Sequence, residues 1–312
     1  MASLKDVGER ALIRNIIDMI RPGPFVGPGD DAAVVRIEDG RIVAGTDMVS
    51  FERHFPSGMT YEQFGWTAAA VNFSDMAGMG ARPIGLLASF AMPGDMDESS
   101  LYEMVGGMDR CAEHCGTHII GGDTKPGPGI IVGTALGSLD GRAPLLRSGA
   151  RPGDMVAVTG RLGGAAAAFA ALENGMEGCS LQPLLAPIPR VKEGIALSSL
   201  WAATSCMDLS DGLAEAAGSI CRASGVGMEI RMEFIPAGGD VPKICSETNL
   251  SYTDALLYWG GDYELLFTFG RERLSELHSV GLDFSVIGAV TDGNGPYVTD
   301  GEERTVMKNA RY

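Results

Sequence analysis

The chain has 312 residues, of which 45% are hydrophobic and 21% are charged, and its formal net charge is −16. This composition is typical of a soluble globular protein with room for two domains, and the acidic charge argues against nucleic acid as a partner. Because the sequence has no apolar run long enough to span a bilayer and no basic-then-apolar leader, we expect no membrane partner and a cytoplasmic location.

The first half is predicted to mix helices and strands. Apolar residues at helical spacing predict a helix at 4–20, which a run of Arg, Pro and Gly ends. A second helix is predicted from Tyr61 to Met79, with small residues that allow close packing, and a third from Ser99 to Cys115, with Ser99 as its cap. Apolar and β-branched runs predict strands at 32–36, 42–45, 84–90, 118–120 and 130–135.

Residues 142–152 are polar and rich in glycine and proline, which is typical of a domain junction. We therefore expect one domain at 1–148 and another at 149–312. In the second half we predict strands at 155–160 and 204–208, helices at 163–172 and 212–224, and a proline-rich loop at 181–189. Hairpin-like strand pairs and long helices are not strictly interleaved, so the expected fold class is α+β.

The six cysteines include no Cys-x-x-Cys pair, and in a cytoplasmic chain they are most simply reduced, buried side chains. One spacing leaves an alternative open. Cys111, His114, Cys115 and His118 have the spacing of one helical face, and zinc could use such ligands. Since Gly116 interrupts that run and His118 is expected to begin a strand, we favour the structural role.

Six acidic motifs recur along the chain, each an aspartate in or beside a short break rich in Gly, Ser or Thr. They are Gly29-Asp30-Asp31, Gly45-Thr46-Asp47, Asn72-Phe73-Ser74-Asp75, Gly121-Gly122-Asp123-Thr124, Asp208-Leu209-Ser210-Asp211 and Gly260-Gly261-Asp262. We interpret the set as one metal site assembled from several loops. Asp75 interrupts an apolar helix, where a carboxylate is costly to bury unless it is paired or binds a metal. Asp208 ends an apolar strand, where active-site residues commonly emerge.

Oxygen ligands of this kind suit Mg²⁺, which usually binds together with substrate phosphates, and this favours phosphoryl transfer. The sequence has no P-loop motif, no protein-kinase signature, no Gly-x-Ser-x-Gly elbow and no His-Glu-x-x-His motif. Since the chain has only four histidines, we do not expect a His-rich metal site. Carboxylates and glycines therefore carry the candidate chemistry.

The order of these motifs gives the chain a resemblance over nearly its whole length. It resembles the thiamine-monophosphate kinases, of the superfamily that includes aminoimidazole ribonucleotide synthetase and selenophosphate synthetase. The most specific blocks are residues 72–81, with the pattern Asn-x-Ser-Asp-x-Ala-x-Met-Gly-Ala, and Arg147-Ser148-Gly149-Ala150. Further matches lie at residues 29–33, 121–124, 208–213 and 262–265.

This resemblance implies a two-domain fold like that of aminoimidazole ribonucleotide synthetase, with an N-terminal sheet that forms a homodimer interface and a C-terminal domain that covers the nucleotide. It also implies ATP-dependent phosphorylation of thiamine monophosphate to thiamine diphosphate with several Mg²⁺ ions. The nucleophile would be a phosphate oxygen of the acceptor, already ionised at neutral pH, so no general base is required. Catalysis then consists of positioning and charge neutralisation in an in-line transfer.

The resemblance also implies roles for individual residues. Asp75 and Arg147 are the implied catalytic residues. The implied metal ligands are Asp30, Gly45 (through its carbonyl or a water), Thr46, Asp47, Asp75, Asp123 and Asp208, with Asp211 at a more peripheral ion. The implied ATP contacts are Gly121, Gly122, Arg147 and Ser210. The implied acceptor contacts are His54, Gly261 and Tyr312.

The chain departs from the family pattern at two places. Many members have Gly-Gly-Glu-Asp-Tyr-Glu-Leu, in which the first Glu approaches the acceptor, whereas Gly261 stands in that place here. A hydroxyl residue often precedes Thr46-Asp47, where this chain has Gly45. Three alternatives therefore stay open: a sister enzyme with another acceptor, such as an aminoimidazole ribonucleotide synthetase-like activity, a nucleotide- or metal-binding protein without turnover, and a metal-dependent phosphohydrolase.

Overall fold

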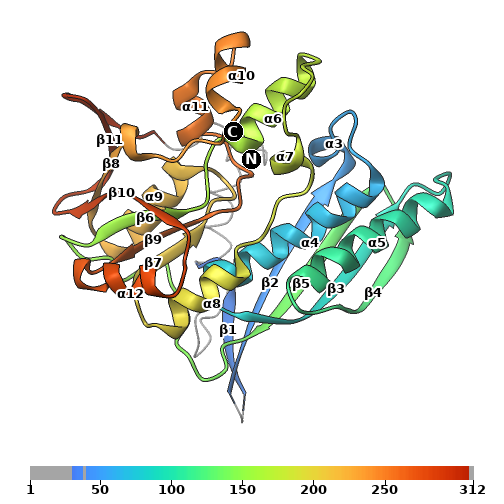
Figure 1. Ribbon diagram of the computed structural model, residues 1–312. Coiled ribbons are helices and arrows are strands. Elements are labelled where there is room, and N and C mark those ends of the chain that lie inside the picture. Colours follow the sequence, from blue (N-terminus) through green and yellow to red (C-terminus); the bar gives the residue numbers. More distant parts are fainter. Residues whose placement is uncertain (1–29, 38–39, 309–312) are drawn as a thin grey trace, which may run out of the picture.

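The computed structural model describes residues 30–37 and 40–308. The helix expected at 4–20 and the acceptor contact expected at Tyr312 lie outside these ranges. Within them the chain forms a five-stranded and a seven-stranded sheet, each packed against helices, which confirms the α+β expectation (Figure 1). None of the described helices is long and apolar enough to cross a membrane.

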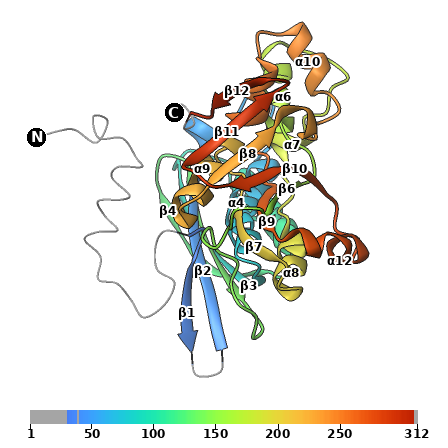
Figure 2. The same ribbon diagram turned by 90° about the vertical axis from the view of Figure 1, so that its left-hand side faces the viewer.

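The N-terminal sheet has the strand order β1-β2-β5-β3-β4. Its strands are β1 (Ala33–Ile37), β2 (Gly40–Ser50), β3 (Arg82–Met92), β4 (Ile119–Pro126) and β5 (Ile130–Ser138). Neighbouring strands are antiparallel except β3 and β4, which run parallel. The hairpin of β1 and β2 extends beyond the rest of the sheet (Figure 1 and Figure 2). β4 is an edge strand, so two strands separate it from β2.

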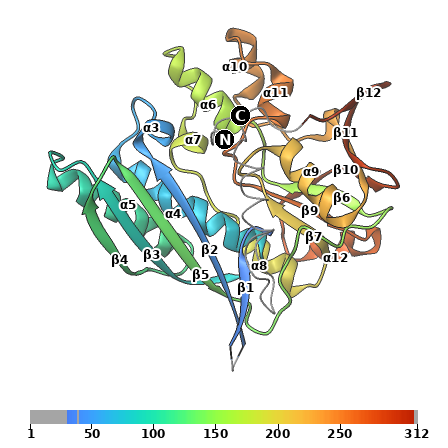
Figure 3. The ribbon, with the colours of Figure 1, turned by 180° about the vertical axis from the view of Figure 1, so that it is seen from behind.

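Two helices cover one face of this sheet, α4 (Tyr61–Gly78) and α5 (Glu98–His114) (Figure 1). α4 begins at a capping box, in which Thr60 and Gln63 each accept a hydrogen bond from the other's backbone N–H. α4 itself carries apolar and small residues on all of its sides, because it is packed between the sheet and the C-terminal half of the chain. Seen from behind, none of the described helices covers the opposite face of the sheet (Figure 3).

The C-terminal sheet has the order β12-β11-β8-β10-β6-β9-β7. Its strands are β6 (Met155–Thr159), β7 (Ala203–Asp208), β8 (Gly227–Arg231), β9 (Leu265–Phe269), β10 (Phe284–Thr291), β11 (Gly295–Asp300) and β12 (Glu303–Val306). The accompanying helices are α6 (Gly164–Glu173), α7 (Gln182–Leu185), α8 (Val191–Ser199), α9 (Leu213–Ser224), α10 (Val241–Glu247), α11 (Tyr252–Leu257) and α12 (Leu274–Ser279). A short helix in the N-terminal half, α3 (Phe51–His54), directly follows β2.

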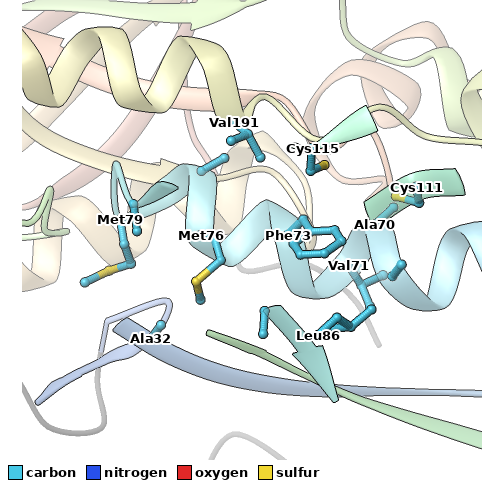
Figure 4. Close-up of a cluster of buried hydrophobic side chains, with 14 of the residues drawn as sticks. Ala32, Ala70, Val71, Phe73, Met76, Met79, Leu86, Cys111, Cys115 and Val191 are labelled. Carbon is cyan, nitrogen blue, oxygen red and sulfur yellow. The ribbon is translucent and has the colours of Figure 1, made fainter. Parts of the chain in front are cut away.

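One hydrophobic core continues from the N-terminal sheet through α4 to α8. Figure 4 shows Phe73 and Met76 of α4 between Leu86, on the sheet side, and Val191 of α8. The two helices approach very closely, because a β-carbon at Gly194 would overlap the carbonyl oxygen of Ala77. This close packing fixes the C-terminal domain against the last turns of α4, where Asp75 lies.

Most of the predicted elements are present, with differences at their ends and in two of the acidic motifs. Gly45-Thr46-Asp47 and Gly121-Gly122-Asp123-Thr124 are not loops but lie inside β2 and β4. Both strands continue through their glycines because the sheet ladder pairs Gly45 of β2 with β5 and the two glycines of β4 with β3. α5 begins after Asp97 instead of Ser99, without a side-chain cap. The loop expected at 181–189 contains the short helix α7.

The alternative zinc interpretation finds no support in the described part of the chain. Cys111 and Cys115 are buried in the core between α4 and α5, and both are free thiols. Burial raises the pKa of the Cys111 thiol well above its ordinary value, so it stays protonated and apolar in character. Their role is packing.

Two neighbouring glycines of α5 provide a test of the packing between α4 and α5. A β-carbon at Gly107 would overlap the carbonyl oxygen of Glu62, whereas one at Gly106 would meet only the flexible side chain of Arg110 at 3.4 Å or more. We expect Gly107→Ala to destabilise the protein by about 2 kcal/mol or more, because backbone must move. Gly106→Ala is the matched control and should be neutral or stabilising by about 0.5–1 kcal/mol. Thermal unfolding of the two variants measures the difference, and equal midpoints would contradict this packing.

Candidate active site

The structure gathers acidic side chains from both halves of the chain where α4, β2 and β7 meet. Asp31 lies two residues before the start of β1, Asp47 lies on β2, Asp75 lies in the last turn of α4 and Asp208 ends β7. We call these four carboxylates the aspartate cluster. Arg147, in the junction between the two sheets, brings a guanidinium to the same place.

The side chain of Asp31 is almost fully enclosed, with 1% of it exposed. Its carboxylate accepts a hydrogen bond from Nε of Arg147 at 2.8 Å, forms an ion pair with the same guanidinium, and accepts from the Asp208 N–H at 3.3 Å. The neighbouring Asp30 accepts from the Arg147 N–H at 2.7 Å. A β-carbon at Gly78 would overlap the Asp31 carboxylate, so α4 can come this close only with glycine there. Asp31 therefore joins the start of β1, α4, the junction and β7.

The Asp208 carboxylate is held by two hydroxyl groups. Ser74 donates to one oxygen at 2.6 Å and Ser210 to the other at 3.3 Å. Burial and the charge of Asp31 raise the pKa of Asp208 to about 7, although Ser74 and Arg147 oppose the shift. Ser210, implied as an ATP contact, thus lies next to the cluster.

Asp75 faces the same space from α4. Burial, followed by the charges of Asp208, Asp47 and Asp31, raises the pKa of Asp75 well above its ordinary value. On the opposite side, a β-carbon at Gly45 of β2 would lie 3.2 Å from Oδ2 of Asp75. The small residue that replaces the family's hydroxyl therefore leaves room directly beside this carboxylate.

Asp47 is positioned through the backbone of β2. Its N–H donates to Oδ1 of Asn72 at 3.0 Å, and Nδ2 of Asn72 donates to the Ala68 carbonyl one turn earlier in α4. Burial, together with the charges of Asp211 and Asp31, raises the pKa of Asp47 to about 6. Asp211 is thereby placed close to the cluster, as the peripheral role implies.

Thr46 points to the other face of the sheet, because successive side chains of a strand alternate. Its hydroxyl donates to the Gly133 carbonyl at 2.6 Å and accepts from Thr134 at 3.0 Å. Thr46 can therefore bind a metal at the cluster only through its carbonyl oxygen. Its hydroxyl can bind one only on the open face of the sheet.

Gly121, Gly122 and Asp123 lie away from the cluster. Asp47 pairs with Gly133, Gly133 with Ala88, and Ala88 with Gly122, so three inter-strand steps, about 14 Å, separate β2 from β4. Asp123 pairs with Ser89 and its side chain is 62% exposed, in an ion pair with Lys125. One copy of the chain does not bring Asp123 to the other carboxylates.

Two of the residues implied as acceptor contacts lie in the described ranges, one in each half of the chain. His54 ends α3, and its Nδ1 accepts from the Ser50 N–H at 3.1 Å, which leaves Nε2 to carry the proton. Partial burial lowers the pKa of His54, so the ring is neutral at pH 7. Gly261 has a left-handed backbone with φ of +90°, and its N–H donates to the Ser210 carbonyl at 2.8 Å. Gly261 is thus fixed to the Asp208–Asp211 loop.

The sixth acidic motif has a structural role in this arrangement. Asp262 accepts hydrogen bonds from the N–H groups of Gly163 at 2.7 Å and Ala165 at 3.1 Å, so it caps the N-terminus of α6. Glu264 accepts two hydrogen bonds from Arg190, both at 2.6 Å, and one from Thr159 at 2.7 Å. These bonds fix the segment that follows Gly261.

Sequence reasoning did not assign roles to Asp31, Asn72, Arg190 and Glu264, which build the site. Asn72 carried a usable signal, since it lies three residues before Asp75 and therefore on the same side of α4. Asp31 stands next to Asp30, and the local sequence does not show which of the two side chains turns inward. The pairing of Arg190 with Glu264 joins positions far apart in the chain and has no local signal.

The cluster is suited to cations that arrive with a substrate. In the ranges 30–37 and 40–308, no three Asp, Glu, His or Cys side chains converge closely enough to form a ready-made metal cage. Burial first, and the charges of neighbouring aspartates second, raise the pKa values of Asp47, Asp75 and Asp208. Mg²⁺ usually binds through one or two carboxylates, several waters and substrate phosphates. The carboxylates of the aspartate cluster are suited to this mode of binding.

Comparison with known proteins identifies relatives along the whole chain. The family model of the AIR synthase related protein N-terminal domain matches residues 29–139, and that of the C-terminal domain matches residues 151–301. The thiamine-monophosphate kinase of Pyrococcus abyssi is 36% identical, covering 88% of this chain and 86% of its own, and that of Methanospirillum hungatei is 36% identical, covering 90% and 92%. The solved structure of AaThiL complexed with AMPPCP and TMP has a TM-score of 0.88 at 29% identity, covering 99% and 98%.

Neutralising one member of the cluster should stabilise the metal-free protein. We expect Asp47→Asn to raise the unfolding temperature without Mg²⁺ by roughly 2 °C, because one repelling charge is removed. The further rise that Mg²⁺ produces in the wild-type protein should shrink in this variant, since a ligand is lost. Thermal melts with and without MgCl₂ measure both effects. Asp109→Asn, on the exposed face of α5, is the control and should change neither. An unchanged Mg²⁺ response in Asp47→Asn would contradict a role in cation binding.

Proposed function

This chain belongs to the AIR synthase related family, and from that premise we propose that it phosphorylates thiamine monophosphate with ATP, giving thiamine diphosphate and ADP. The observation that carries the proposal is the aspartate cluster with Arg147 at the junction of the two halves. It lies in a fold shared over nearly its full length with AaThiL complexed with AMPPCP and TMP.

The reaction suits a site without a histidine or cysteine base. A phosphate monoester loses its second proton near pH 6, so at pH 7 the acceptor oxygen is already a nucleophile. The side chains are then required to align the acceptor oxygen with the γ-phosphoryl group of ATP and to balance charge. No carboxylate is then needed as a general base, and the proposed role of Asp47, Asp75 and Asp208 is to bind cations.

The residues that would hold Mg²⁺ are Asp30, Asp47, Asp75 and Asp208, with the backbone at Gly45 and Thr46 and with Asp211 at the margin. Bound Mg²⁺ supplies charge neutralisation between two phosphate groups and an acidic protein. Arg147 contributes a positive charge from the protein itself. Its guanidinium is oriented by Asp31 and 24% of its side chain remains exposed, which suits a contact to a transferred phosphate. Ser210, on the same loop as Asp208, is placed to contact the nucleotide.

On the acceptor side, the neutral ring of His54 can donate a hydrogen bond through Nε2 to the phosphate of thiamine monophosphate. Gly261 borders the same space from the C-terminal half. Tyr312, outside the described ranges, stays a proposed acceptor contact. The domain boundary between residues 148 and 149 also stays a proposal, and it falls between the two matched regions.

We infer further that the protein acts as a homodimer through the open face of the N-terminal sheet (Figure 3). This face carries exposed apolar side chains, among them Met48 of β2, Leu87 of β3 and Ile120 of β4. Asp123 lies on the same face, away from the cluster of its own chain. If Asp123 and the Gly121-Gly122 backbone serve the reaction, a second copy packed on this face is the simplest way to bring them to a cluster.

The central test is turnover. Purified protein with ATP, MgCl₂ and thiamine monophosphate should form thiamine diphosphate and ADP in equal amounts, measured by chromatography. Asp75→Asn should lower kcat by roughly 100-fold or more while circular dichroism stays unchanged, because a shared ligand is lost. Asp109→Asn should retain full activity. Release of free phosphate without an acceptor, or turnover only with another phosphorylated acceptor, would replace the proposal with a phosphohydrolase or a sister enzyme.

Mixed dimers test whether Asp123 acts across the dimer. Asp75→Asn and Asp123→Asn subunits should each be nearly inactive alone. When both are co-expressed with different tags, a mixed dimer holds one site with both wild-type carboxylates if Asp123 serves the partner's cluster. Random pairing then restores about a quarter of the wild-type activity. If Asp123 serves its own cluster, every site contains one substitution and the mixture stays inactive.

A further inference from the structure

An aromatic pair lies beside the position where the acceptor-contacting Glu of many relatives is replaced by Gly261. Trp259, two residues earlier, is 37% exposed. Its indole packs on Phe169 of α6, with ring centroids 5.4 Å apart and ring planes at 37°. The inference drawn from this pair rests on the proposed function, since it concerns the acceptor.

Backbone contacts hold Trp259 against the loop that follows Asp208 of the aspartate cluster. The Trp259 N–H donates to the Asp254 carbonyl at the end of α11. A β-carbon at Gly212 would lie 2.8 Å from the Trp259 carbonyl oxygen, and Gly261 is bonded to the Ser210 carbonyl. The backbone of Trp259 and of Gly261 is therefore held against the 208–212 loop, and the indole ring stays accessible.

The helix behind the indole faces the N-terminal half of the site. Phe169 and Leu172 are three residues apart on α6 and share one side of it. The Leu172 side chain lies 3.6 Å from a β-carbon placed at Gly58, in the loop that follows α3. α6 and α3 are neighbours in both front and rear views (Figure 1 and Figure 3). The aromatic pair is thus carried by a helix that contacts the N-terminal half next to α3, the helix that His54 ends. We call this side of α6, together with Trp259, the wall.

We propose that Trp259, supported by Phe169, is a specificity-determining residue that binds the cationic ring system of the acceptor. Thiamine monophosphate combines a phosphate with a thiazolium cation and an aminopyrimidine. An exposed indole attracts a flat cation through its π-face and stacks on a heteroaromatic ring. With the phosphate at His54 and the cluster, the rings must extend along the wall that carries Trp259 and Gly261. The π-face then supplies recognition that a Glu side chain supplies elsewhere in the family.

Steady-state kinetics with a matched tryptophan control test this proposal. Trp259→Ala should raise the KM for thiamine monophosphate by about ten-fold, leaving the KM for ATP and kcat close to wild type. Trp259→Phe should recover most of the loss, because the π-face is kept. Trp201→Ala is the control, since Trp201 is 66% exposed and follows α8, away from this wall. Equal KM values for the acceptor in Trp259→Ala and Trp201→Ala would overturn the proposal.

A binding measurement separates this proposal from the proposed function. Thiamine without its phosphate cannot accept a phosphoryl group at the same oxygen, but it carries both rings. Its addition should quench the tryptophan fluorescence of the wild-type and Trp201→Phe proteins and not that of Trp259→Phe. Failure of the wild-type protein to phosphorylate thiamine monophosphate would sink the proposed function. Normal turnover with unchanged quenching in Trp259→Phe would sink only the role of Trp259.

Discussion

The buried ion pair between Asp31 and Arg147 is the interaction on which the arrangement of the site depends. It joins the first strand of one sheet to the junction that leads to the other, and the same carboxylate accepts from the backbone of Asp208. Leaving one partner of such a pair buried and uncompensated typically costs about 3–5 kcal/mol. The two halves of the chain can therefore change their relative position only by exposing or unpairing Asp31. The close helix contacts at Gly78 and Gly194 reinforce this constraint.

The cluster itself opposes folding. Four carboxylates lie close together, and burial and mutual repulsion raise the pKa values of Asp47, Asp75 and Asp208. A chain selected only for stability would replace some of them with apolar or amide side chains. Their retention is explained if cations and phosphates enter together, because the charges are then balanced only in the loaded site. Local destabilisation and function are in this way two consequences of one arrangement.

The sequence was sufficient to predict α4 and the strand-rich halves. It also singled out Asp75 as a candidate, because a carboxylate among the small apolar residues of a helix is costly to bury unless it is paired or binds a metal. It was not sufficient to place Asp123, since the order of strands in a sheet is set by long-range pairing. β4 lies at the edge, parallel to β3, and nothing in its own sequence states this. The choice between Asp30 and Asp31, and the conversion of Asp262 from a candidate ligand into the cap of α6, likewise depend on contacts between distant segments.

The replacement of a Glu by Gly261 removes a negative charge from the neighbourhood of the aspartate cluster. Gly261 is bonded to the loop of Asp208 and Asp211, so a carboxylate there would add another negative charge to a cluster that already repels itself. An aromatic surface recognises a flat cation without adding charge. It distinguishes ring shape and polarisability, whereas a carboxylate mainly distinguishes charge and one hydrogen-bond donor. With Trp259 in this position, the indole both attracts the flat cation and selects among acceptors by the shape of their rings.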